Sequence, residues 1–264
     1  MDPAAAAERA LADYAAEPGR SALVRIDVDG RVWEGGVAAD VARPAASLLK
    51  LAVAIAAEEA IADGSLDATR RIPIAELGAT PRDRSALGLL DPARDLGVAE
   101  VLGLMLGASD NPCARWLVDR LGLARIADVV TALGCTATAI EPDAEAGVGG
   151  VTTCRDALAL LAAASDAALR PASARALRGS IRNARIPLGA TGDDIRIAHK
   201  TGTLAGVAHD VAVLECTGGT ARVAFLTERQ HDTLVTGYAM GICTREVLTA
   251  WGLAVRSTTS AVGG

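Results

Sequence analysis

Aromatic side chains and surplus positive charge are both scarce in this sequence. Phenylalanine, tyrosine and tryptophan make up 2% of its 264 residues, and 26 basic residues stand against 32 acidic ones, for a formal net charge of −6. Proteins that bind single-stranded nucleic acid stack bases on aromatic rings, and proteins that bind duplexes or anionic membranes present a basic face. The composition therefore predicts neither a nucleic acid nor a membrane as a partner.

The sequence also gives no sign of a metal centre or a disulfide framework. It has three histidines, and its five cysteines are scattered, without a CxxC pair. Zinc sites and disulfide-rich domains show regular cysteine and histidine spacings. We therefore expect no metal, no cofactor and reduced, buried cysteines.

A leader peptide and a membrane span are not visible either. The chain starts MDPAAAAERA, without a basic segment followed by an apolar run, and its most apolar stretch, residues 51–62, is interrupted by Glu58 and Glu59. Secretory signals and transmembrane helices need longer uncharged runs. The chain as written is expected in the cytoplasm, whereas a leader removed beforehand would place it in the periplasm or outside the cell.

Strand and helix signals alternate in a definite order along the chain. Strands are expected over 21–28, 31–36, 194–199, 207–216 and 220–227. Helices are expected over 2–16, 46–63, 97–107, 111–122, 124–133, 154–166, 171–183 and 234–255. This order predicts an α+β fold, an α/β sandwich with one five-stranded antiparallel sheet covered by the terminal helices.

The long helical block between the two groups of strands predicts an inserted, all-helical subdomain. Residues 1–45 plus 184–264 would form the sheet subdomain, and residues 46–183 the helical one. Clefts favour the boundary between such units, so an active site is expected where the helical insert meets the sheet.

Lysine is the rarest of the charged residues. Only Lys50 and Lys200 are lysines, so the other 24 of the 26 basic residues (26 − 2) are arginines. A genome rich in arginine codons explains the arginines but not the two exceptions. A buried lysine can lose its proton and act as a base, whereas arginine effectively cannot. The two lysines are therefore the first candidates for chemistry.

Ser47 and Lys50 form a Ser-x-x-Lys motif at the start of the first helix of the insert. Residues three apart on a helix share a face, so the amine can reach the hydroxyl, which is a weak nucleophile until a base takes its proton. The apolar residues 51–57 would desolvate Lys50 and lower its pKa. Taken alone, the motif equally fits a serine that caps the helix and a solvated lysine.

A second motif, Ser109-Asp110-Asn111, lies between two expected helices. All three residue types are strong helix caps, so a purely structural interpretation is available. In the functional interpretation, Ser109 passes a proton to a leaving group and Asn111 hydrogen-bonds a substrate amide.

The third motif is HKTGT at residues 199–203, at the end of an expected strand. Lys200 is expected to attract a substrate carboxylate and to bias the proton of Ser109. Gly202 would let a ligand approach the strand closely, because it has no side chain.

Ser-x-x-Lys, Ser-Asp-Asn and Lys-Thr-Gly occur in this order in penicillin-interactive serine enzymes. Both lysines of the chain fall within these motifs. With the order of elements, they make the chain resemble class A β-lactamases and the related penicillin-binding DD-peptidases over nearly its whole length. The resemblance implies an acyl-enzyme mechanism, in which Ser47 attacks a carbonyl, Lys50 transfers its proton and Ser109 protonates the departing nitrogen.

The same resemblance implies a small-molecule substrate that carries a carboxylate, such as a β-lactam or a peptide-like molecule. Lys200, Thr201, Gly202 and Thr203 would hold the carboxylate, and Asn111 the amide. We expect a monomer.

The loop that supplies the deacylating base in class A β-lactamases departs from the family pattern. That pattern is Glu-Pro-x-Leu-Asn, but this chain reads EPDAE at residues 141–145, followed by glycines at 147, 149 and 150. Three possibilities stay open: Glu141 activates the water, Glu145 does, or neither does. The glycines predict a mobile or collapsed loop that positions water poorly.

A second departure follows the Lys-Thr-Gly strand, where family members often place an arginine. This chain has His209 there, which either faces the substrate or pairs with Asp210, and Arg222 on the next strand is another candidate cation. The family disulfide at the first helix of the insert is absent, because residue 54 is alanine.

These features favour a serine hydrolase of class A β-lactamase type, acting on β-lactams or related amides and esters. Two alternatives keep the same chemistry: a DD-peptidase that deacylates slowly, and a cytoplasmic esterase or amidase. A non-catalytic binding module is a fourth possibility, against which the three intact motifs weigh.

Overall fold

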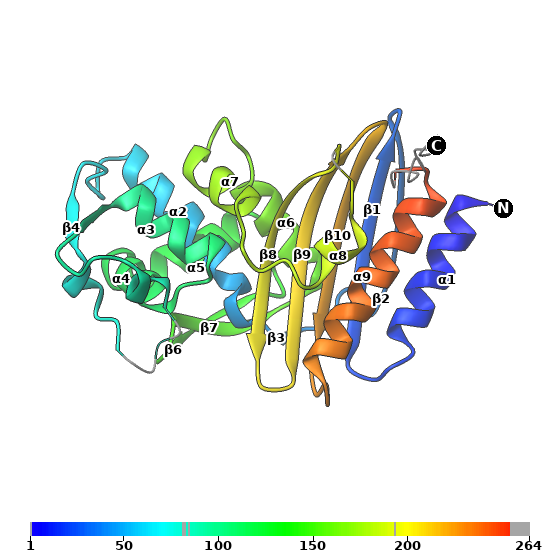
Figure 1. Ribbon diagram of the computed structural model, residues 1–264, viewed down its shortest axis with the longest axis horizontal. Coiled ribbons are helices and arrows are strands. Elements are labelled where there is room, and N and C mark those ends of the chain that lie inside the picture. The colour runs from blue at the N-terminus through cyan, green and yellow to red at the C-terminus, as the bar shows by residue number, and fades with distance from the viewer. Residues whose placement is uncertain (1, 81–82, 84, 193, 254–264) are drawn as a thin grey trace, which may run out of the picture.

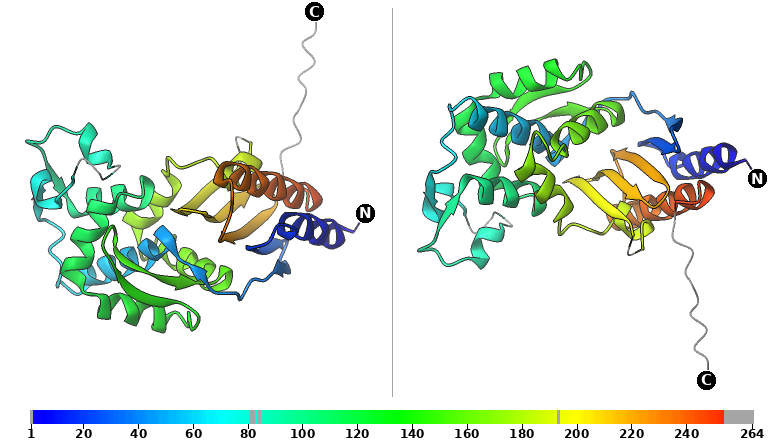
Figure 2. Two further views of the ribbon diagram at one scale, coloured as in Figure 1. Left: turned by 90° about the horizontal axis from the view of Figure 1, so that it is seen from below. Right: turned by 90° about the horizontal axis from the view of Figure 1, so that it is seen from above.

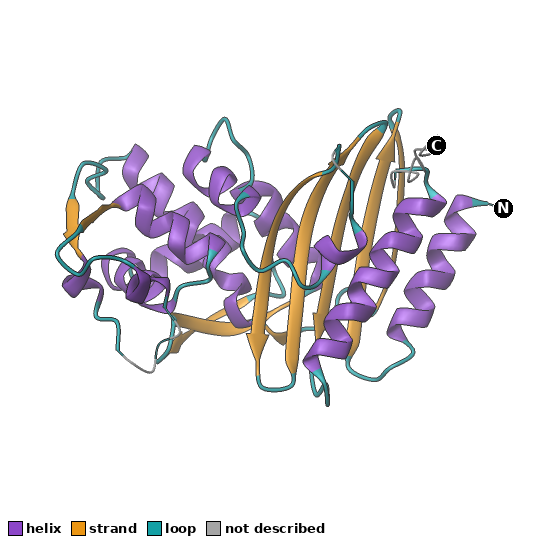
Figure 3. Ribbon diagram, in the orientation of Figure 1, coloured by secondary structure: helices purple, strands orange, loops and turns teal. Residues whose placement is uncertain are grey.

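The computed structural model describes residues 2–80, 83, 85–192 and 194–253. A five-stranded antiparallel sheet with the strand order β2-β1-β10-β9-β8 runs through its middle (Figures 1 and 3). Its strands are β1 (Arg20–Val28), β2 (Arg31–Val37), β8 (Arg196–Leu204), β9 (Val207–Cys216) and β10 (Gly219–Thr227). The predicted sheet, which joins strands from both ends of the chain, is confirmed.

Alternate residues of the sheet pack into two separate cores, one on each face. On β1, Val24 and Ile26 face the terminal helices, whereas Leu23 faces the helical insert. Side chains of a strand alternate between the faces, so both faces of this sheet can be buried. The covering helices on the first face are α1 (Pro3–Ala15) and α9 (Thr233–Ala250), with the short α8 (Ile186–Gly189) beside α9 (Figure 2).

The helical insert packs on the other face around one buried helix, α2 (Lys50–Ala62). Nine of its 13 residues are buried, because it is apolar on all sides. Around it lie α3 (Val98–Gly107), α4 (Asn111–Leu121), α5 (Leu123–Ala132), α6 (Cys154–Ala164) and α7 (Pro171–Arg178).

The ends of several helices differ from those expected. The first turn of the expected 46–63 helix is a 3₁₀ turn, η1 (Ala46–Leu49), and the expected 171–183 helix stops at Arg178. Two further 3₁₀ turns, η2 (Ile74–Leu77) and η3 (Ala86–Leu89), lie in the insert. The last helix ends at Ala250, and positions 254 and 255 of its expected range lie outside the described residues.

The expectation of an all-helical insert is wrong. The strands β4 (Arg71–Pro73) and β5 (Asp95–Gly97) pair with each other, and a three-stranded sheet has the order β3-β7-β6. Its strands are β3 (Arg43–Pro44), β6 (Ala139–Asp143) and β7 (Gly147–Thr152). Such short strands contain too few alternating positions to be recognised, and the glycines of β7 hide its pattern.

The hairpin β6–β7 occupies the stretch for which a mobile or collapsed loop is expected. Its strands pair from Ala139 opposite Val151 to Asp143 opposite Gly147. Gly150 has a φ of 129°, and a side chain there would collide with the carbonyl of Ala139. Glycine therefore permits the close pairing of the two strands.

No helix among the described residues is long and apolar enough to span a membrane. Within the same residues, no group of three histidine, cysteine or acidic side chains is arranged to hold a metal ion.

Candidate active site

Ser47 lies on the turn η1, where a short strand leads into the buried helix α2. The backbone N–H of Ala45 donates to the carbonyl of Gly150 (2.9 Å), which ties this segment to β7. Ala46 adopts a left-handed conformation (φ 50°), and a Cβ atom on Gly202 would lie 3.1 Å from its Cβ. The missing side chain of Gly202 thus makes room for the segment that carries Ser47, rather than for a ligand as expected.

Lys50 enters the protein interior on the first turn of α2. Its side chain is fully buried, and Nζ donates to the carbonyl of Ser109 (2.6 Å) and to Oδ1 of Asn111 (2.6 Å). Burial lowers the pKa of Lys50 to about 8, although the negative charge of Asp110 counteracts the shift. Burial destabilises the charged amine. About a tenth of Lys50 is therefore neutral and able to accept a proton at pH 7, and about half at pH 8.

Ser109 is held between the two lysines in a left-handed conformation (φ 62°), which is costly for a residue other than glycine. Its carbonyl accepts from Lys50, and its Oγ accepts from Nζ of Lys200 (2.9 Å). Lys200 is fully buried and also donates to the carbonyl of Thr201 (2.8 Å). Burial and the nearby charge of Lys50 lower the pKa of Lys200 well below its usual value.

Asp110 shows that the capping interpretation of the second motif also applies. Its carboxylate accepts from the backbone N–H of Cys113 (3.1 Å) at the start of α4, from Oγ of Ser85 (2.6 Å) and from the N–H of Ala86 (2.9 Å). A cap at this point ends one helix, starts the next and fixes the turn on which Ser109 and Asn111 lie.

An open cleft of about 240 Å³ lies in front of these groups. It is lined by Ser47, Ser109, Asn111, Pro112, Arg182, Thr201 and Thr203. The strand β8 continues to Leu204, so the Lys-Thr-Gly motif forms one wall from within the strand rather than from its end. The fold thus brings the three motifs to one place, with both lysines buried behind the wall.

Two arginines from the loop between α7 and α8 add positive charge to the cleft. Arg182 lines it and donates through Nε and Nη2 to the carbonyl of Ala108 (3.3 and 3.1 Å). Arg185 donates to the carbonyl of Gly202 (2.8 Å), to Oγ1 of Thr203 (2.6 Å) and to the carbonyl of His209. No sequence pattern distinguishes these two from the other arginines among the 24.

The model of the beta-lactamase enzyme family matches residues 4–251. The chain belongs to this family. It is a serine hydrolase of the β-lactamase type. No curated protein sequence gives a significant match.

Solved structures with the same fold agree with this assignment. A beta-lactamase from Sphaerobacter thermophilus DSM 20745 is 25% identical, with a TM-score of 0.81 over 96% of this chain and 99% of that one. PBP-A is 23% identical, with a TM-score of 0.78 over 94% and 96%. A mutant class A beta-lactamase of the last common ancestor of Gram-negative bacteria is 22% identical, with a TM-score of 0.77 over 93% and 99%.

In this member of the beta-lactamase family, His209 does not contact the cleft, and both interpretations of it need correction. It is fully buried; its Nδ1 accepts from the N–H of Thr227 (3.0 Å), so Nε2 carries the proton and donates to the carbonyl of Pro44 (2.7 Å). Burial lowers the pKa of His209 to about 4, and the ring is neutral at neutral pH. The partner of Asp210 is His199, at 2.9 Å.

Arg222 lies on β10 opposite Arg25 and is not among the residues that line the cleft. Among the described residues, the arginine that lines the cleft is Arg182, on the loop between α7 and α8.

The hairpin carboxylates of this beta-lactamase family member lie outside the cleft that contains Ser47. Glu141 is exposed on β6, where it pairs with Gly149. Glu145 lines a neighbouring hollow of about 670 Å³ together with Asn111, which belongs to both cavities. Of the two glutamates that the sequence offers as the base for the deacylating water, Glu145 is therefore the better placed.

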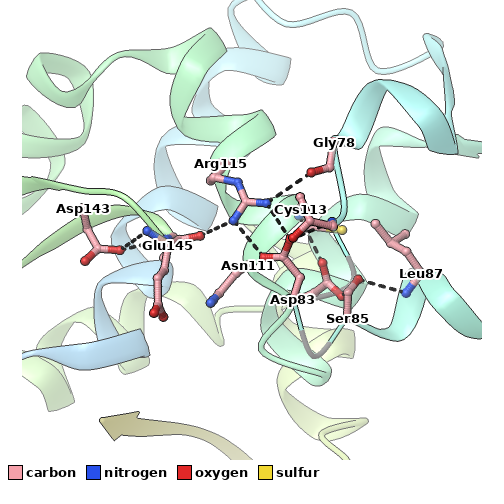
Figure 4. Close-up of polar contacts among 12 residues, drawn as sticks. Gly78, Asp83, Ser85, Leu87, Asn111, Cys113, Arg115, Asp143 and Glu145 are labelled. Atoms are coloured by element: carbon pink, nitrogen blue, oxygen red, sulfur yellow. Dashed lines mark hydrogen bonds and ion pairs between the residues drawn. The ribbon is translucent and has the colours of Figure 1, made fainter. Parts of the chain in front are cut away.

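Arg115 fixes the position of Glu145. Its guanidinium binds both oxygens of Asp83 (3.0 and 3.2 Å) and also donates to the carbonyl oxygens of Glu145 and Gly78 (Figure 4). One side chain thus joins α4 to the segment between η2 and η3 and to the hairpin turn.

Proposed function

We propose that this protein cleaves β-lactams, or related amides and esters that carry a carboxylate, through an acyl-enzyme on Ser47. The observation that carries the proposal is the buried amine of Lys50, held by Ser109 and Asn111 behind the cleft that exposes Ser47. The pKa of Lys50, lowered to about 8, suits a general base near neutral pH.

The residues of the cleft account for each proton in the first half-reaction. Neutral Lys50 takes the proton of Ser47 as Oγ attacks the carbonyl carbon. The carbon–nitrogen or carbon–oxygen bond then breaks, and Ser109 gives its proton to the departing atom. The ammonium formed on Lys50 returns a proton to Ser109, so that the proton of Ser47 ends on the departing atom. Lys200 supports that transfer, because its Nζ donates to Oγ of Ser109 (2.9 Å), and a hydrogen-bond donor at this oxygen favours the deprotonated hydroxyl. Water then hydrolyses the ester on Ser47.

The substrate carboxylate would bind at the Thr201–Thr203 wall. Both threonines line the cleft with Arg182, and Arg185 donates to the hydroxyl of Thr203. Arginine and hydroxyl donors suit a carboxylate. A single-residue mutant of PBP-A, a structural relative, is described as an acyl-enzyme complex with penicillin G.

Slow deacylation is the second candidate, and the hairpin β6–β7 favours it. None of the described residues that line the cleft with Ser47 is acidic, and Glu141 is exposed on the hairpin. A carboxylate must reach the attacking water directly or through one water to act as its base. A penicillin-binding enzyme with a long-lived acyl group is consistent with this arrangement.

Intact-protein mass spectrometry after mixing with a penicillin, alongside turnover of a chromogenic cephalosporin, tests the proposal. Turnover without a lasting adduct identifies a working β-lactamase. A lasting adduct on Ser47 without turnover identifies the slow form. If the folded protein shows neither turnover nor an adduct, β-lactam chemistry is rejected and the esterase or amidase alternative remains.

The two hairpin glutamates provide a matched pair of variants. We expect Glu145→Gln to lengthen the lifetime of the acyl-enzyme by about 10²-fold or more, the usual contribution of a general base. Glu141→Gln should leave the lifetime unchanged, because Glu141 lines neither cavity, whereas Glu145 lines the hollow that also contains Asn111. Stopped mass-spectrometric time courses measure both. Equal acyl-enzyme lifetimes in the wild type and both variants would show that Glu145 does not act in deacylation.

Arg182 offers a test of carboxylate binding. We expect Arg182→Ala to raise KM about tenfold for substrates with a carboxylate and to leave kcat nearly unchanged, because one charged hydrogen bond is lost. Arg178→Ala is the control, since that arginine is exposed and pairs with Glu215 at 3.1 Å. A methyl ester of the substrate should bind both variants and the wild type alike; an Arg182 effect on the ester as well would contradict the assignment.

A further inference from the structure

A buried histidine directly precedes Lys200 on β8 and takes no part in the proton transfers described above. His199 is 2% exposed, and its Nδ1 donates to Oδ1 of Asp210 on β9 (2.9 Å), which is fully buried. Neighbouring residues of a strand point to opposite faces, so the ring lies on the other side of β8 from the amine that contacts Ser109. A buried pair of this kind loses hydration and adds little net stability, so what it orders is the better guide to its role.

Both members of the pair bond to the chain between α7 and α8, of which we name residues 179–185 the arginine loop. Nε2 of His199 forms a hydrogen bond with Oδ1 of Asn183, within the loop (3.1 Å). The second carboxylate oxygen of Asp210 accepts from the backbone N–H of Ile186, directly after the loop (3.0 Å). The loop runs from α7 across β8 to α8 and is thus fastened to the sheet at two points (Figure 1).

The two fastened residues directly follow the two arginines of the loop. Asn183 follows Arg182, which lines the cleft, and Ile186 follows Arg185. Arg185 also donates to the carbonyl of Gly202 on β8 (2.8 Å), so its place does not depend on the pair alone. The pair therefore matters most for the position of Arg182.

The stretch around Arg182 is held by polar contacts rather than by packing. Residues 181–184 are all exposed, so buried apolar surface does not fix them. The N–H of Ile181 donates to the carbonyl of Gly107 (3.1 Å), which ties the loop to the helical insert. Asn183 ties it to β8, the strand that forms one wall of the cleft. The guanidinium between these two ties is held relative to both the insert and the sheet.

We propose that His199 is a positioning residue for Arg182: through Asn183 it holds the arginine loop where the guanidinium faces a substrate carboxylate. The inference rests on the proposed function, in which Arg182 binds that carboxylate. Hydrogen bonds weaken steeply as their geometry departs from the optimum, and a binding group must be held by contacts behind it. A histidine that touches no substrate thereby sets the preference for substrates with a carboxylate.

Two variants remove the link and leave the buried carboxylate with a donor. Asn183→Ala deletes the partner on the loop, at an exposed position. His199→Asn keeps an N–H donor near the place of Nδ1, for Asp210, but has no atom that reaches Asn183. We expect each variant to raise the penicillin G concentration that half-saturates acylation of Ser47 by about three- to fivefold, the loss of one ordinary hydrogen bond, at an unchanged limiting rate.

A double-mutant cycle with Arg182→Ala separates positioning from a general loss of stability. In the Arg182→Ala background neither variant should raise the half-saturating concentration further, because the guanidinium that they misplace is gone. The methyl ester of penicillin G should bind all of these proteins alike. Ile181→Ala is the matched control, since its side chain is 70% exposed on the same loop, and this variant should be acylated as the wild type is.

Hydrogen exchange tests the tether without any substrate. The backbone N–H groups of residues 182–186 should exchange faster in Asn183→Ala and in His199→Asn than in the wild type, because an opened contact exposes the loop to water. Unchanged exchange in both variants shows that His199 does not hold the loop and overturns the proposal. Equal changes in half-saturation with and without Arg182 overturn it as well, because the link then acts on something other than the guanidinium.

Failure of the proposed function gives a different pattern. If Arg182→Ala and the wild type need the same penicillin G concentration for half-saturation, Arg182 does not bind the carboxylate, and the inference is overturned together with that assignment. Faster loop exchange in the two link variants would then show that the tether exists and that the carboxylate site is the part that failed.

Discussion

Ser47→Ala is expected to abolish both acylation by a penicillin and turnover of a chromogenic cephalosporin. Ser47 supplies the hydroxyl in the cleft that lies in front of the buried Lys50. Without Oγ no ester can form, and loss of a serine nucleophile in a hydrolase typically lowers kcat by about 10⁶-fold. Mass spectrometry should show the unmodified chain mass at every time of incubation.

The fold should survive this change, because the side chain of Ser47 lines an open cleft and removal of one hydroxyl leaves no cavity in the core. Thermal unfolding of the variant checks this point. Ser173→Ala is a useful control: Ser173 is buried on α7, away from the cleft, and its hydroxyl has no partner among the described residues. Normal turnover by Ser47→Ala would refute the acyl-enzyme mechanism.

Lys50→Arg is expected to reduce acylation by about 10²- to 10⁴-fold, the usual contribution of a general base. Arginine keeps a positive charge but does not release its proton, so the variant separates the base from the charge. Because burial lowers the pKa of Lys50 to about 8, the wild-type acylation rate should rise about tenfold per pH unit below that value and level off above it.

The direction of this profile follows from the form of Lys50 that works. The neutral amine accepts the proton of Ser47, and its fraction increases as the pH rises through the pKa. Single-turnover acylation rates measured from about pH 6 to 10 give the profile. A flat profile in the wild type, or an acylation rate in Lys50→Arg equal to that of the wild type, would exclude Lys50 as the base.

Lys50 also links activity to stability. Its pKa is about 8 in the folded protein and 10.5 in a solvated lysine, so the unfolded chain binds more protons between these values. Stability rises with pH wherever the unfolded state binds more protons. The contribution of Lys50 therefore becomes more favourable from about pH 8 upwards, and the buried charge below that pH is a cost that the active site imposes on the fold.

The sequence by itself determined the chemistry and the general architecture. Ser47 and Lys50 could be selected because their spacing places them on one helix face, and Ser109 because the three motifs together resemble those of penicillin-interactive serine enzymes. The five-stranded sheet could be predicted because alternation along β1 and β10 reflects which side chains are buried on each face. The helix spacing and the strand alternation both involve neighbouring residues, so a single sequence shows them.

The tertiary structure alone decided which residues surround that chemistry. Lys200 meets Ser109 across 91 positions of sequence, and Arg182 and Arg185 reach the cleft from a loop that nothing in the sequence distinguishes. The position of His209 after the motif leaves it open whether the ring faces the substrate or pairs with Asp210, and the packing of β9 against Pro44 instead buries it. The hairpin in place of the expected loop depends on pairing between β6 and β7, and thus on contacts that no local pattern reports. Burial and long-range contact set charge, pKa and access, and these arise only when the chain is folded.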